Sequence, residues 1–301
     1  MKRWNFALVK PTLGNKLSPL VMAFVVMIML VGMSGAVMSQ LPIAERTQFL
    51  LSSALQNVFA FIFPAWLVAR LCYASPSRYL GLSQPTAARQ YLGMVLLYLA
   101  MLPAMNMIIE WNENIHLPEA MSGFEQTMRM LEDNAADITE SILYDTSWWG
   151  LISGVLIVGC LTGLAEESFF RAGLQKAFTS SGINPHVSIW TVAVIFSAIH
   201  FQFFGFVPRV LLGAFFGYLY WYTGSLWIPA AAHALNNSLA VISSWLVARG
   251  WIADDAGDFL IQGTQGVVLG IFSLAATAII IFKWGKSLFT PPTDNGTTER
   301  A

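Results

Sequence analysis

The chain has 301 residues, of which 56% are hydrophobic and only 11% are charged. A soluble domain carries about 25% charged residues. Because the apolar residues here also gather in long runs, the composition predicts a polytopic membrane protein. The net charge of −1 excludes a general electrostatic attraction to nucleic acid. The two cysteines, Cys72 and Cys160, fall in apolar runs on different predicted helices, which argues against a disulfide framework or a cysteine metal site.

Eight apolar segments approach the length of about 20 residues that a helix needs to cross a bilayer. The first is too long for the apolar region of a secretory signal, so we expect it to be retained as a span. The fourth continues as a helix to about Phe178. We therefore predict an all-α transmembrane bundle of about eight spans. These are Pro19–Met38, Phe49–Tyr73, Tyr91–Ile109, Trp148–Leu164, Val187–Phe201, Val207–Tyr222, Leu226–Ala248 and Leu260–Phe282.

Lysine and arginine residues gather on one side of this predicted bundle and acidic residues on the other. Cytoplasmic loops are enriched in Lys and Arg, so we expect both termini in the cytoplasm. As a separate expectation, we place this multi-pass protein in a bacterial inner (plasma) membrane. Arg209 and Arg249 are isolated exceptions. The cationic side holds Lys2, Arg3, Lys10, Lys16, Arg78, Arg89, Lys176, Lys283 and Lys286, and the acidic side holds the loop Glu110–Asp145 with Asp254, Asp255 and Asp258.

The long acidic loop is expected to contain one amphipathic helix, because Phe124, Met128 and Leu131 recur at helical spacing. We expect this helix to cap the outer face rather than to bind substrate. The polar tail Pro291–Ala301 is expected to be disordered. We predict one integral membrane unit with three parts: residues 1–147 with the first spans and the acidic loop, 148–250 as a catalytic helix core, and 251–301 with the last span and the tail.

The stretch AEESFFR, Ala165–Arg171, places charged residues at the end of an apolar run, where they are costly and indicate a role. On a helix, Glu167 and Arg171 lie on one face in the favourable acid-before-base order. Glu166 is rotated from Glu167 by about 100°. We therefore expect Glu167 and Arg171 to form a structural pair and Glu166 to be free for chemistry.

Four further polar residues lie inside apolar runs. His233 and Asn237 share a helix face, whereas Asn236 is turned away from it. His200 and Glu166 lie at matching heights if their helices form an antiparallel hairpin around the turn Ser180–Pro185. A single intramembrane histidine is more often a helix–helix hydrogen bond. A glutamate, two histidines and an asparagine on three neighbouring helices instead indicate a catalytic or metal site.

These residues form three motifs: Glu166-Glu167-xxx-Arg171, Phe196-xxx-His200 and His233-xxx-Asn237. In this order, on separate spans, they resemble the CPBP family of intramembrane proteases, which includes CAAX prenyl endopeptidases and bacteriocin-processing or self-immunity proteins. The resemblance covers about Gly150–Ala248. It implies a membrane-embedded peptidase that acts on a peptide or protein substrate, with or without a lipid group, within membrane lipid and without nucleic acid.

The resemblance also implies roles for the motif residues. Glu166 and His200 would activate a water for attack on the peptide carbonyl, and His233 and Asn237 would stabilise the oxyanion. Arg171 would keep Glu167 ionised and thereby fix the rotation of the helix that aims Glu166. Phe196, one turn before His200, would pack its helix against a neighbour.

Other functions remain open at the level of sequence. Glu166, His200 and His233 could instead hold a catalytic zinc ion. We favour the metal-free mechanism, without a cofactor, because no HExxH motif is present. The polar cluster could also only tie helices together in a non-enzymatic scaffold or immunity protein, or relay protons in a transporter. A transporter is disfavoured because no pair of interrupted helices occurs in matching halves.

Overall fold

The protein is described from a computed structural model, which covers residues 13–38, 42–143, 145–253 and 263–290. Every regular element in these ranges is a helix, so the predicted all-α fold is confirmed. The elements are α1 (Leu13–Met38), α2 (Glu45–Gln56), η1 (Asn57–Ile62), α3 (Phe63–Cys72), α4 (Pro76–Leu80), α5 (Ala88–Glu113), η2 (Glu119–Met121), α6 (Ser122–Leu143), α7 (Trp148–Gly154), η3 (Val155–Leu161), α8 (Thr162–Glu167), η4 (Ser168–Gln175), α9 (Lys176–Thr179), α10 (Pro185–Ala198), α11 (Phe206–Thr223), α12 (Trp227–Ala248) and α14 (Gly263–Phe289).

Four helices of the described chain are long and apolar enough to cross a membrane, and two shorter apolar helices accompany them. The membrane class is therefore confirmed, whereas the number of spans and the side of the termini stay predictions. Several residues used to orient the chain, Lys2, Arg3, Lys10, Asp254, Asp255 and Asp258, lie outside the described residues, as does the tail Pro291–Ala301. The long helices are Glu45–Cys72, Ala88–Glu113, Trp148–Thr179 and Gly263–Gly285, and the shorter ones are Leu17–Met33 and Pro185–Ala198.

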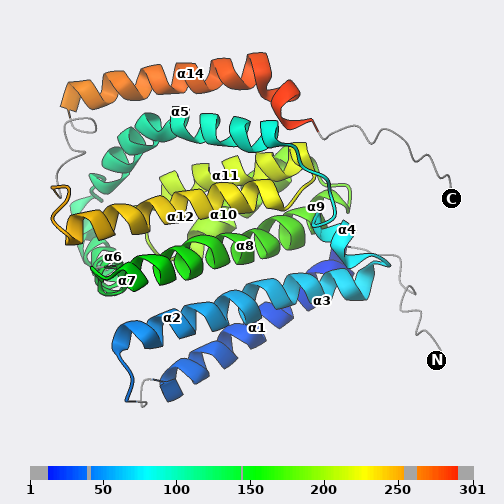
Figure 1. Cartoon of the computed structure of the whole chain (residues 1–301), viewed down its shortest axis with the longest axis horizontal. Coiled ribbons are helices and arrows are strands. Elements are labelled where there is room, and N and C mark those ends of the chain that lie inside the picture. The colour runs from blue at the N-terminus through cyan, green and yellow to red at the C-terminus, as the bar shows by residue number, and fades with distance from the viewer. Residues whose placement is uncertain (1–12, 39–41, 144, 254–262, 291–301) are drawn as a thin grey trace.

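The bundle is layered, and the helices that carry the motifs occupy its middle (Figure 1). The pair α5 and α14 forms one edge, and α1 with α2 and α3 forms the opposite edge. Between them, α12 packs against η3 and α8, and α10 packs against α11. The three motifs therefore belong to neighbouring helices, as their common polarity predicts.

The fourth predicted span is one continuous helix from Trp148 to Thr179, which confirms its extension beyond the apolar run. Two of its stretches, η3 and η4, are π-helical, and the six residues of α8 lie between them. π-Turns inside helices are frequent at functional sites. Glu166 and Glu167 are the last two residues of α8.

The turn after this helix forms where the sequence predicts it. Gly182 has a φ of 89°, which favours glycine. Asn184 then caps α10 by accepting hydrogen bonds from the backbone N–H groups of His186 and Val187, and Pro185 occupies the first helical turn. The sequence thus reverses the chain sharply and sends α10 back along η4, against which it packs.

A second close approach joins α4 to the turn between α11 and α12. Gly81 has a φ of 78°, and its carbonyl accepts a hydrogen bond from Leu226 N at 3.1 Å. A Cβ at Gly81 would lie 2.6 Å from the carbonyl oxygen of Gly224. Only glycine meets both demands, so this contact ties α4 to the end of the bundle where α9 also ends.

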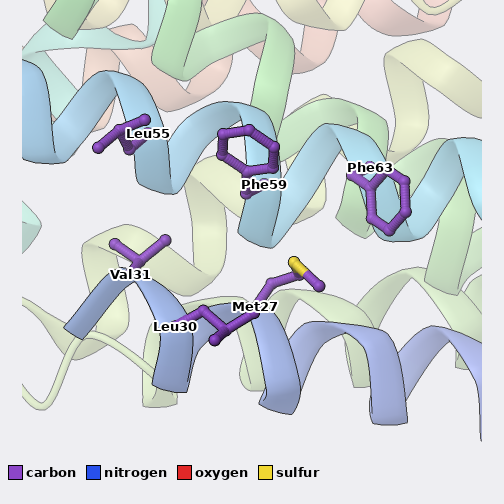
Figure 2. Close-up of a pocket in the computed structure, with 6 residues that line it drawn as sticks. All are labelled: Met27, Leu30, Val31, Leu55, Phe59 and Phe63. Atoms are coloured by element: carbon purple, nitrogen blue, oxygen red, sulfur yellow. The ribbon is translucent and has the colours of Figure 1, made fainter. Parts of the chain in front are cut away.

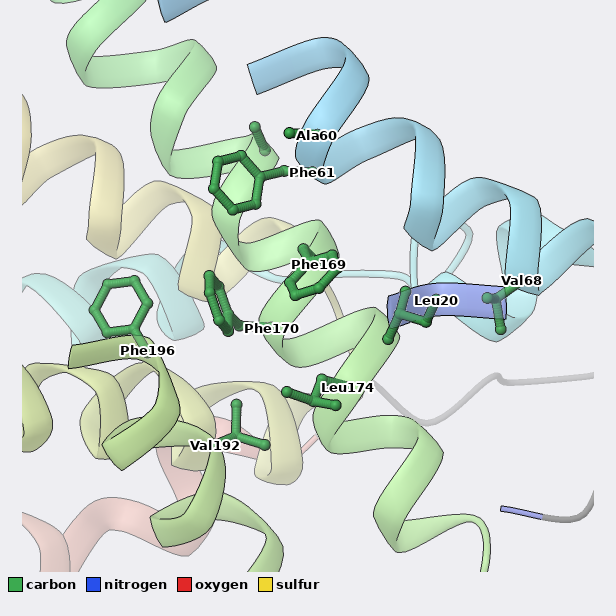
Figure 3. Close-up of a cluster of buried hydrophobic side chains, with 10 residues drawn as sticks. Leu20, Ala60, Phe61, Val68, Phe169, Phe170, Leu174, Val192 and Phe196 are labelled. Atoms are coloured by element: carbon green, nitrogen blue, oxygen red, sulfur yellow. The ribbon is translucent and has the colours of Figure 1, made fainter. Parts of the chain in front are cut away.

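An aromatic cluster packs η4 against its neighbours (Figure 3). Phe169 of η4 meets Phe61 of η1 edge to face, with ring centroids 5.8 Å apart. Phe170 meets Phe196 of α10 in the same manner at 5.1 Å. Edge-to-face pairs favour a defined geometry beyond their buried area. They hold the helix of the acidic pair at a fixed rotation, and Phe196 packs α10 against its neighbour as predicted.

An apolar groove of about 420 Å³ lies between α1 and the helix formed by α2, η1 and α3 (Figure 2). Its lining is entirely apolar and includes no group that could act in hydrolysis. It is separate from the motif residues, none of which lines it. The lining residues are Met27, Leu30, Val31, Leu55, Phe59 and Phe63.

The acidic loop contains the predicted amphipathic helix, α6, which packs against α2, α7 and α12. Met128 is buried, whereas Phe124 and Leu131 are exposed at 54% and 40%. One face of α6 therefore covers the bundle only in part. Its contacts with the connection between α10 and α11 bring it closer to the candidate site than a simple cap requires.

Candidate active site

The predicted pair of Glu167 and Arg171 is present and fully buried. Arg171 Nη1 donates to Glu167 Oε1 at 2.8 Å, and both side chains have 0% exposure. Arg171 Nη2 also donates to the carbonyl of Gly213 at 2.8 Å. The guanidinium lies over the ring of Phe196, 4.9 Å from its centroid. A buried charge needs this degree of compensation, so the pair locks η4 to α10 and α11.

Glu167 has a second partner that sequence reasoning did not identify. Its Oε1 lies 2.9 Å from Nδ1 of His233. An ionised carboxylate only accepts hydrogen bonds, so Nδ1 of His233 carries a proton and donates. The imidazole also stacks on Phe216, with ring centroids 4.8 Å apart and 17° between the planes. Both its orientation and its tautomer are thus fixed, which leaves Nε2 without a proton in the neutral ring.

Glu166 lies on the other side of the same imidazole. Its Oε2 is 3.7 Å from His233 Nε2, and its side chain is 13% exposed. This separation is too long for a direct hydrogen bond, and one water molecule can bridge such a gap. Arg171 therefore holds Glu167 and leaves Glu166 beside an imidazole nitrogen. Glu166 and Glu167, which are adjacent in the sequence, therefore lie beside different nitrogens of the His233 ring.

His200 lies in the connection between α10 and α11. The helix α10 ends at Ala198, shortly before the approximate end of the predicted span Val187–Phe201, and Phe201 has a φ of 54°, which continues no helix. His200 Nδ1 donates to the carbonyl of Phe196 at 2.7 Å, so its Nε2 is also free of a proton in the neutral ring. The ring of Phe196 lies 5.1 Å from that of His200 and 6.0 Å from that of His233.

The connection that carries His200 is fastened by side chains from α5 and α6. Asn112, which is 2% exposed, donates to the carbonyl of Phe203 at 3.1 Å and accepts from Val207 N at 2.9 Å. Glu132 of α6 accepts from Phe204 N at 3.1 Å. Sequence reasoning missed Asn112, since one asparagine at the end of an apolar run gives no signal of a partner about 90 residues away.

Arg209, which the charge pattern marks as an isolated cation, fastens the same connection from α11. Its Nη2 donates to Oε1 of Gln202 at 2.7 Å, and its Nη1 to the carbonyl of Gln202 at 3.3 Å. The segment 202–207 is thus held along its length by three side chains. Arg209 bonds Gln202, Glu132 bonds Phe204, and Asn112 bonds Phe203 and Val207. They fix the path of the chain beyond His200.

The asparagines of α12 point to different neighbours. Asn237 Nδ2 donates to the carbonyl of Val158 at 3.1 Å, and Asn236 Nδ2 donates to Asn237 Oδ1 at 3.1 Å. The hydroxyl of Tyr98 on α5 donates to Asn236 Oδ1 at 3.0 Å. Asn237 thus faces η3 and Asn236 faces α5, which agrees with the predicted separation of the two side chains. The contacts of Asn237 leave one of its amide hydrogens uncommitted.

Gln175 is a further buried polar residue that the motifs do not contain. It lies four residues after Arg171, and its Nε2 donates to the carbonyl of Gly217 at 3.0 Å. The pair Gly213 and Gly217, which the sequence marks only as a small-residue packing pair, accepts from Arg171 and Gln175 in turn. A Cβ at Gly217 would lie 2.9 Å from Gln175 Oε1. Backbone carbonyls of α11 therefore serve as the buried acceptors of η4.

A zinc ion is a poor match to this arrangement. The free Nε2 atoms of two histidines and a carboxylate suit zinc by chemical type. Their positions do not, because the described residues contain no group of three or more His, Cys, Asp or Glu side chains that could hold a metal ion. The alternative zinc set of Glu166, His200 and His233 stays a prediction.

The fold and the site together define an integral membrane protein that buries carboxylates and imidazoles in a shared polar centre. Residues 148–239 match the family described as type II CAAX prenyl endopeptidase Rce1-like. The resemblance predicted from the three motifs is confirmed over these residues. The match contains every motif residue from Glu166 to Asn237.

A curated relative matches a similar length of chain. The uncharacterized protein YpbD of Bacillus subtilis strain 168 is 30% identical over 92 residues, which are 29% of this chain. The chain thus matches less than half, 44%, of that relative's length. No solved structure matches the chain. The activity of the whole chain is therefore a proposal.

Proposed function

We propose that the chain is a membrane-embedded endopeptidase that hydrolyses a peptide bond of a CAAX-type or related substrate, in a bacterial plasma membrane. The family match over residues 148–239 supports a membrane peptidase. The observation that carries the mechanism is the placement of Glu166 and Glu167 at opposite nitrogens of His233, at 3.7 Å and 2.9 Å. This gives one carboxylate for orientation and another for proton transfer.

In the proposed reaction, a water molecule lies between Glu166 and the free Nε2 of His200. Glu166, assisted by His200 Nε2, accepts a proton from this water. At the same time the oxygen of the water forms a bond to the carbonyl carbon of the peptide. The carbon–nitrogen bond of the tetrahedral intermediate then breaks. The proton held by Glu166 passes to the leaving amine, so that the products are a carboxylic acid and an amine.

The oxyanion of the intermediate requires hydrogen-bond donors. Asn237 has one amide hydrogen available beyond its bond to Val158. His233 enters the reaction as the imidazolium, which Glu167 at Nδ1 stabilises, so it donates from Nε2 to the oxyanion and keeps both of its protons throughout. Donors held in place before the reaction are worth most where water is scarce. We infer that Glu167 and Arg171 support the chemistry by positioning His233 rather than by contacting substrate.

The substitution Glu166→Gln tests this function, because it preserves volume and removes the base. We expect peptide cleavage to fall by at least 100-fold, while the thermal unfolding midpoint stays within a few degrees. Cleavage is followed by comparative proteomics of membrane peptides from cells that express either form. Glu119→Gln, at an exposed position of η2, is the matched control. Full cleavage by Glu166→Gln protein would contradict the proposal and favour a non-enzymatic scaffold.

Metal dependence is tested separately on the purified protein. We expect no stoichiometric zinc and no loss of cleavage with a chelator. One zinc ion per chain that is lost together with activity in the chelated protein would contradict the metal-free mechanism and leave the peptidase assignment in place.

A further inference from the structure

A second group of polar side chains lies at the end of the bundle where α4, α9 and the end of α11 meet (Figure 1). Lys176 Nζ is 5.5 Å from the ring centroid of Tyr79 and 5.8 Å from that of Tyr220. Tyr73, directly after α3, stacks on Tyr79 with ring centroids 3.7 Å apart and 16° between the planes. We call these four residues the tyrosine–lysine cluster. It contains none of the motif residues.

The polar atoms of the tyrosine–lysine cluster make no well-formed hydrogen bond in the part of the chain that the structure describes. The hydroxyl oxygens of Tyr73, Tyr79 and Tyr220 are buried and make no hydrogen bond. The Tyr73 hydroxyl lies close enough to that of Tyr79 to raise the pKa of Tyr79, but the two hydroxyls do not form a hydrogen bond of acceptable geometry. Lys176 Nζ makes only the two ring contacts, with no ion pair or hydrogen bond among the described residues. Native proteins rarely leave several buried polar groups unmatched in one place.

The missing partner has a definite chemistry. An ammonium group has three donors and no acceptor, and a tyrosine hydroxyl can donate. Burial raises the pKa of the Tyr79 hydroxyl above its usual value, so this group stays protonated and able to donate. No carboxylate within ion-pair distance of Lys176 occurs among the described residues. The cluster therefore presents one positive charge and three hydroxyl donors to an acceptor that carries negative charge.

The position of the cluster indicates the source of that acceptor. Arg70 and Arg78 are exposed on the neighbouring α3 and α4, so this end of the bundle is cationic. Trp227 Nε1 donates to the carbonyl of Leu82 at the same end, and tryptophan and tyrosine are enriched at membrane interfaces. Cationic groups at this level attract anionic lipid head groups. A phosphate oxygen combines the required charge with several acceptor sites.

We propose that Tyr73, Tyr79, Lys176 and Tyr220 form a binding site for a phosphate oxyanion, supplied by the head group of an anionic phospholipid. The site does not depend on peptidase activity. It stabilises the end of the bundle where the helix of Glu166 and Glu167 terminates. A ligand that binds only the folded chain raises its stability in proportion to the logarithm of its concentration, which gives the proposal a direct measurement.

The test uses the full chain purified in detergent. Its thermal unfolding midpoint is measured after addition of phosphatidylglycerol, phosphatidylcholine or inorganic phosphate, and bound lipid is counted by native mass spectrometry. We expect phosphatidylglycerol to raise the midpoint and to be retained, and phosphatidylcholine to do neither. A shift with inorganic phosphate alone would support the oxyanion site and replace lipid by free phosphate as its source.

Two variants localise the effect. Lys176→Gln should abolish the shift given by phosphatidylglycerol, and Tyr220→Phe should reduce it at least twofold. Tyr222→Phe, on the same helix at 54% exposure, and Lys283→Gln, at an exposed position of α14, are the matched controls and should keep the full shift. If buried water alone satisfies the hydroxyls, Tyr220→Phe keeps the full response. That result, or no response of the original protein to any phosphate, would overturn the proposal.

Discussion

Nδ1 of His233 donates to the same oxygen of Glu167 that accepts from Arg171. One carboxylate oxygen thus links a cation on η4 to an imidazole on α12. The link makes Glu167 more than a structural partner for Arg171, because the proton on Nδ1 decides which nitrogen of His233 faces Glu166. Glu167 therefore fixes both the orientation and the tautomer of the His233 ring through Nδ1, the nitrogen that does not face Glu166.

Arg171→Ala should destabilise the fold by about 3–5 kcal/mol, because it leaves Glu167 buried without its counter-charge. The measurement is the folded fraction after extraction, together with the unfolding midpoint. The double variant Glu167→Leu/Arg171→Met removes both charges and should recover folding, since apolar replacement of a whole buried pair is often neutral. It should not recover cleavage, because His233 loses its orienting acceptor. Recovery of both properties would show that the pair has only a structural role.

Glu167→Gln separates positioning from folding. The amide still accepts from Arg171 through its oxygen but no longer stabilises an imidazolium at His233. We expect cleavage to fall by about 10²–10⁴-fold, the range for a disabled proton-transfer group. The pH profile of the residual activity should change as well. An unchanged profile with a proportionate loss of folded protein would indicate that Glu167 acts on stability alone.

Asn112→Ala should release the connection that carries His200, since its amide serves Phe203 and Val207 at once. Loss of these buried hydrogen bonds costs about 1–3 kcal/mol. Cleavage should fall through kcat, with KM nearly constant, because His200 is misplaced while the substrate surface remains. Asn114→Ala is the control, as this exposed side chain only bonds the carbonyl of Glu110 at 2.7 Å. Equal effects of the two substitutions would show that Asn112 does not position the connection that carries His200.

Gly163→Ala should separate α8 from α12. A Cβ at Gly163 would lie 2.7 Å from the backbone nitrogen of Ala234, the residue after His233. Backbone cannot move aside as a side chain can, so we expect a destabilisation of about 1–3 kcal/mol and a larger loss of cleavage. Gly123→Ala, on α6 with nothing within 4 Å, should leave cleavage unchanged. Normal cleavage by the Gly163→Ala protein would contradict the close helix contact.

The acid stability of α6 depends on Glu125. The backbone N–H of Leu117 donates to this carboxylate and, with Arg129 and His116, lowers its pKa from 4.5 to about 2. A lowered folded pKa means that the stabilisation is complete above pH 4.5 and is lost as the pH falls toward about 2. Glu125→Gln should remove this dependence between those values. The measurement is the unfolding midpoint of both forms across that pH range.

The sequence predicts the parts of the site that depend on spacing along one helix. Glu167 and Arg171 meet because four residues make about one turn, and the turn at Gly182 and Pro185 forms because its residues demand it. The contacts of Asn112, Arg209 and Gln175 were not predicted, because their partners lie on other helices and the pattern of one segment does not specify them. The end of α10 was also not predicted, because the backbone at Phe201 adopts a conformation that its side chain does not favour.

Glu166 and Glu167 lie between the π-helical stretches η3 and η4. The directions of their side chains therefore depend on how many residues the preceding helix contains. Each residue added to or removed from Val155–Leu161 would turn the carboxylates by about 100° around the helix axis. A one-residue deletion there would leave composition, hydropathy and every motif intact, yet aim Glu166 away from His233. Protein engineering of this helix should therefore conserve the count of residues before the glutamates as strictly as the glutamates themselves.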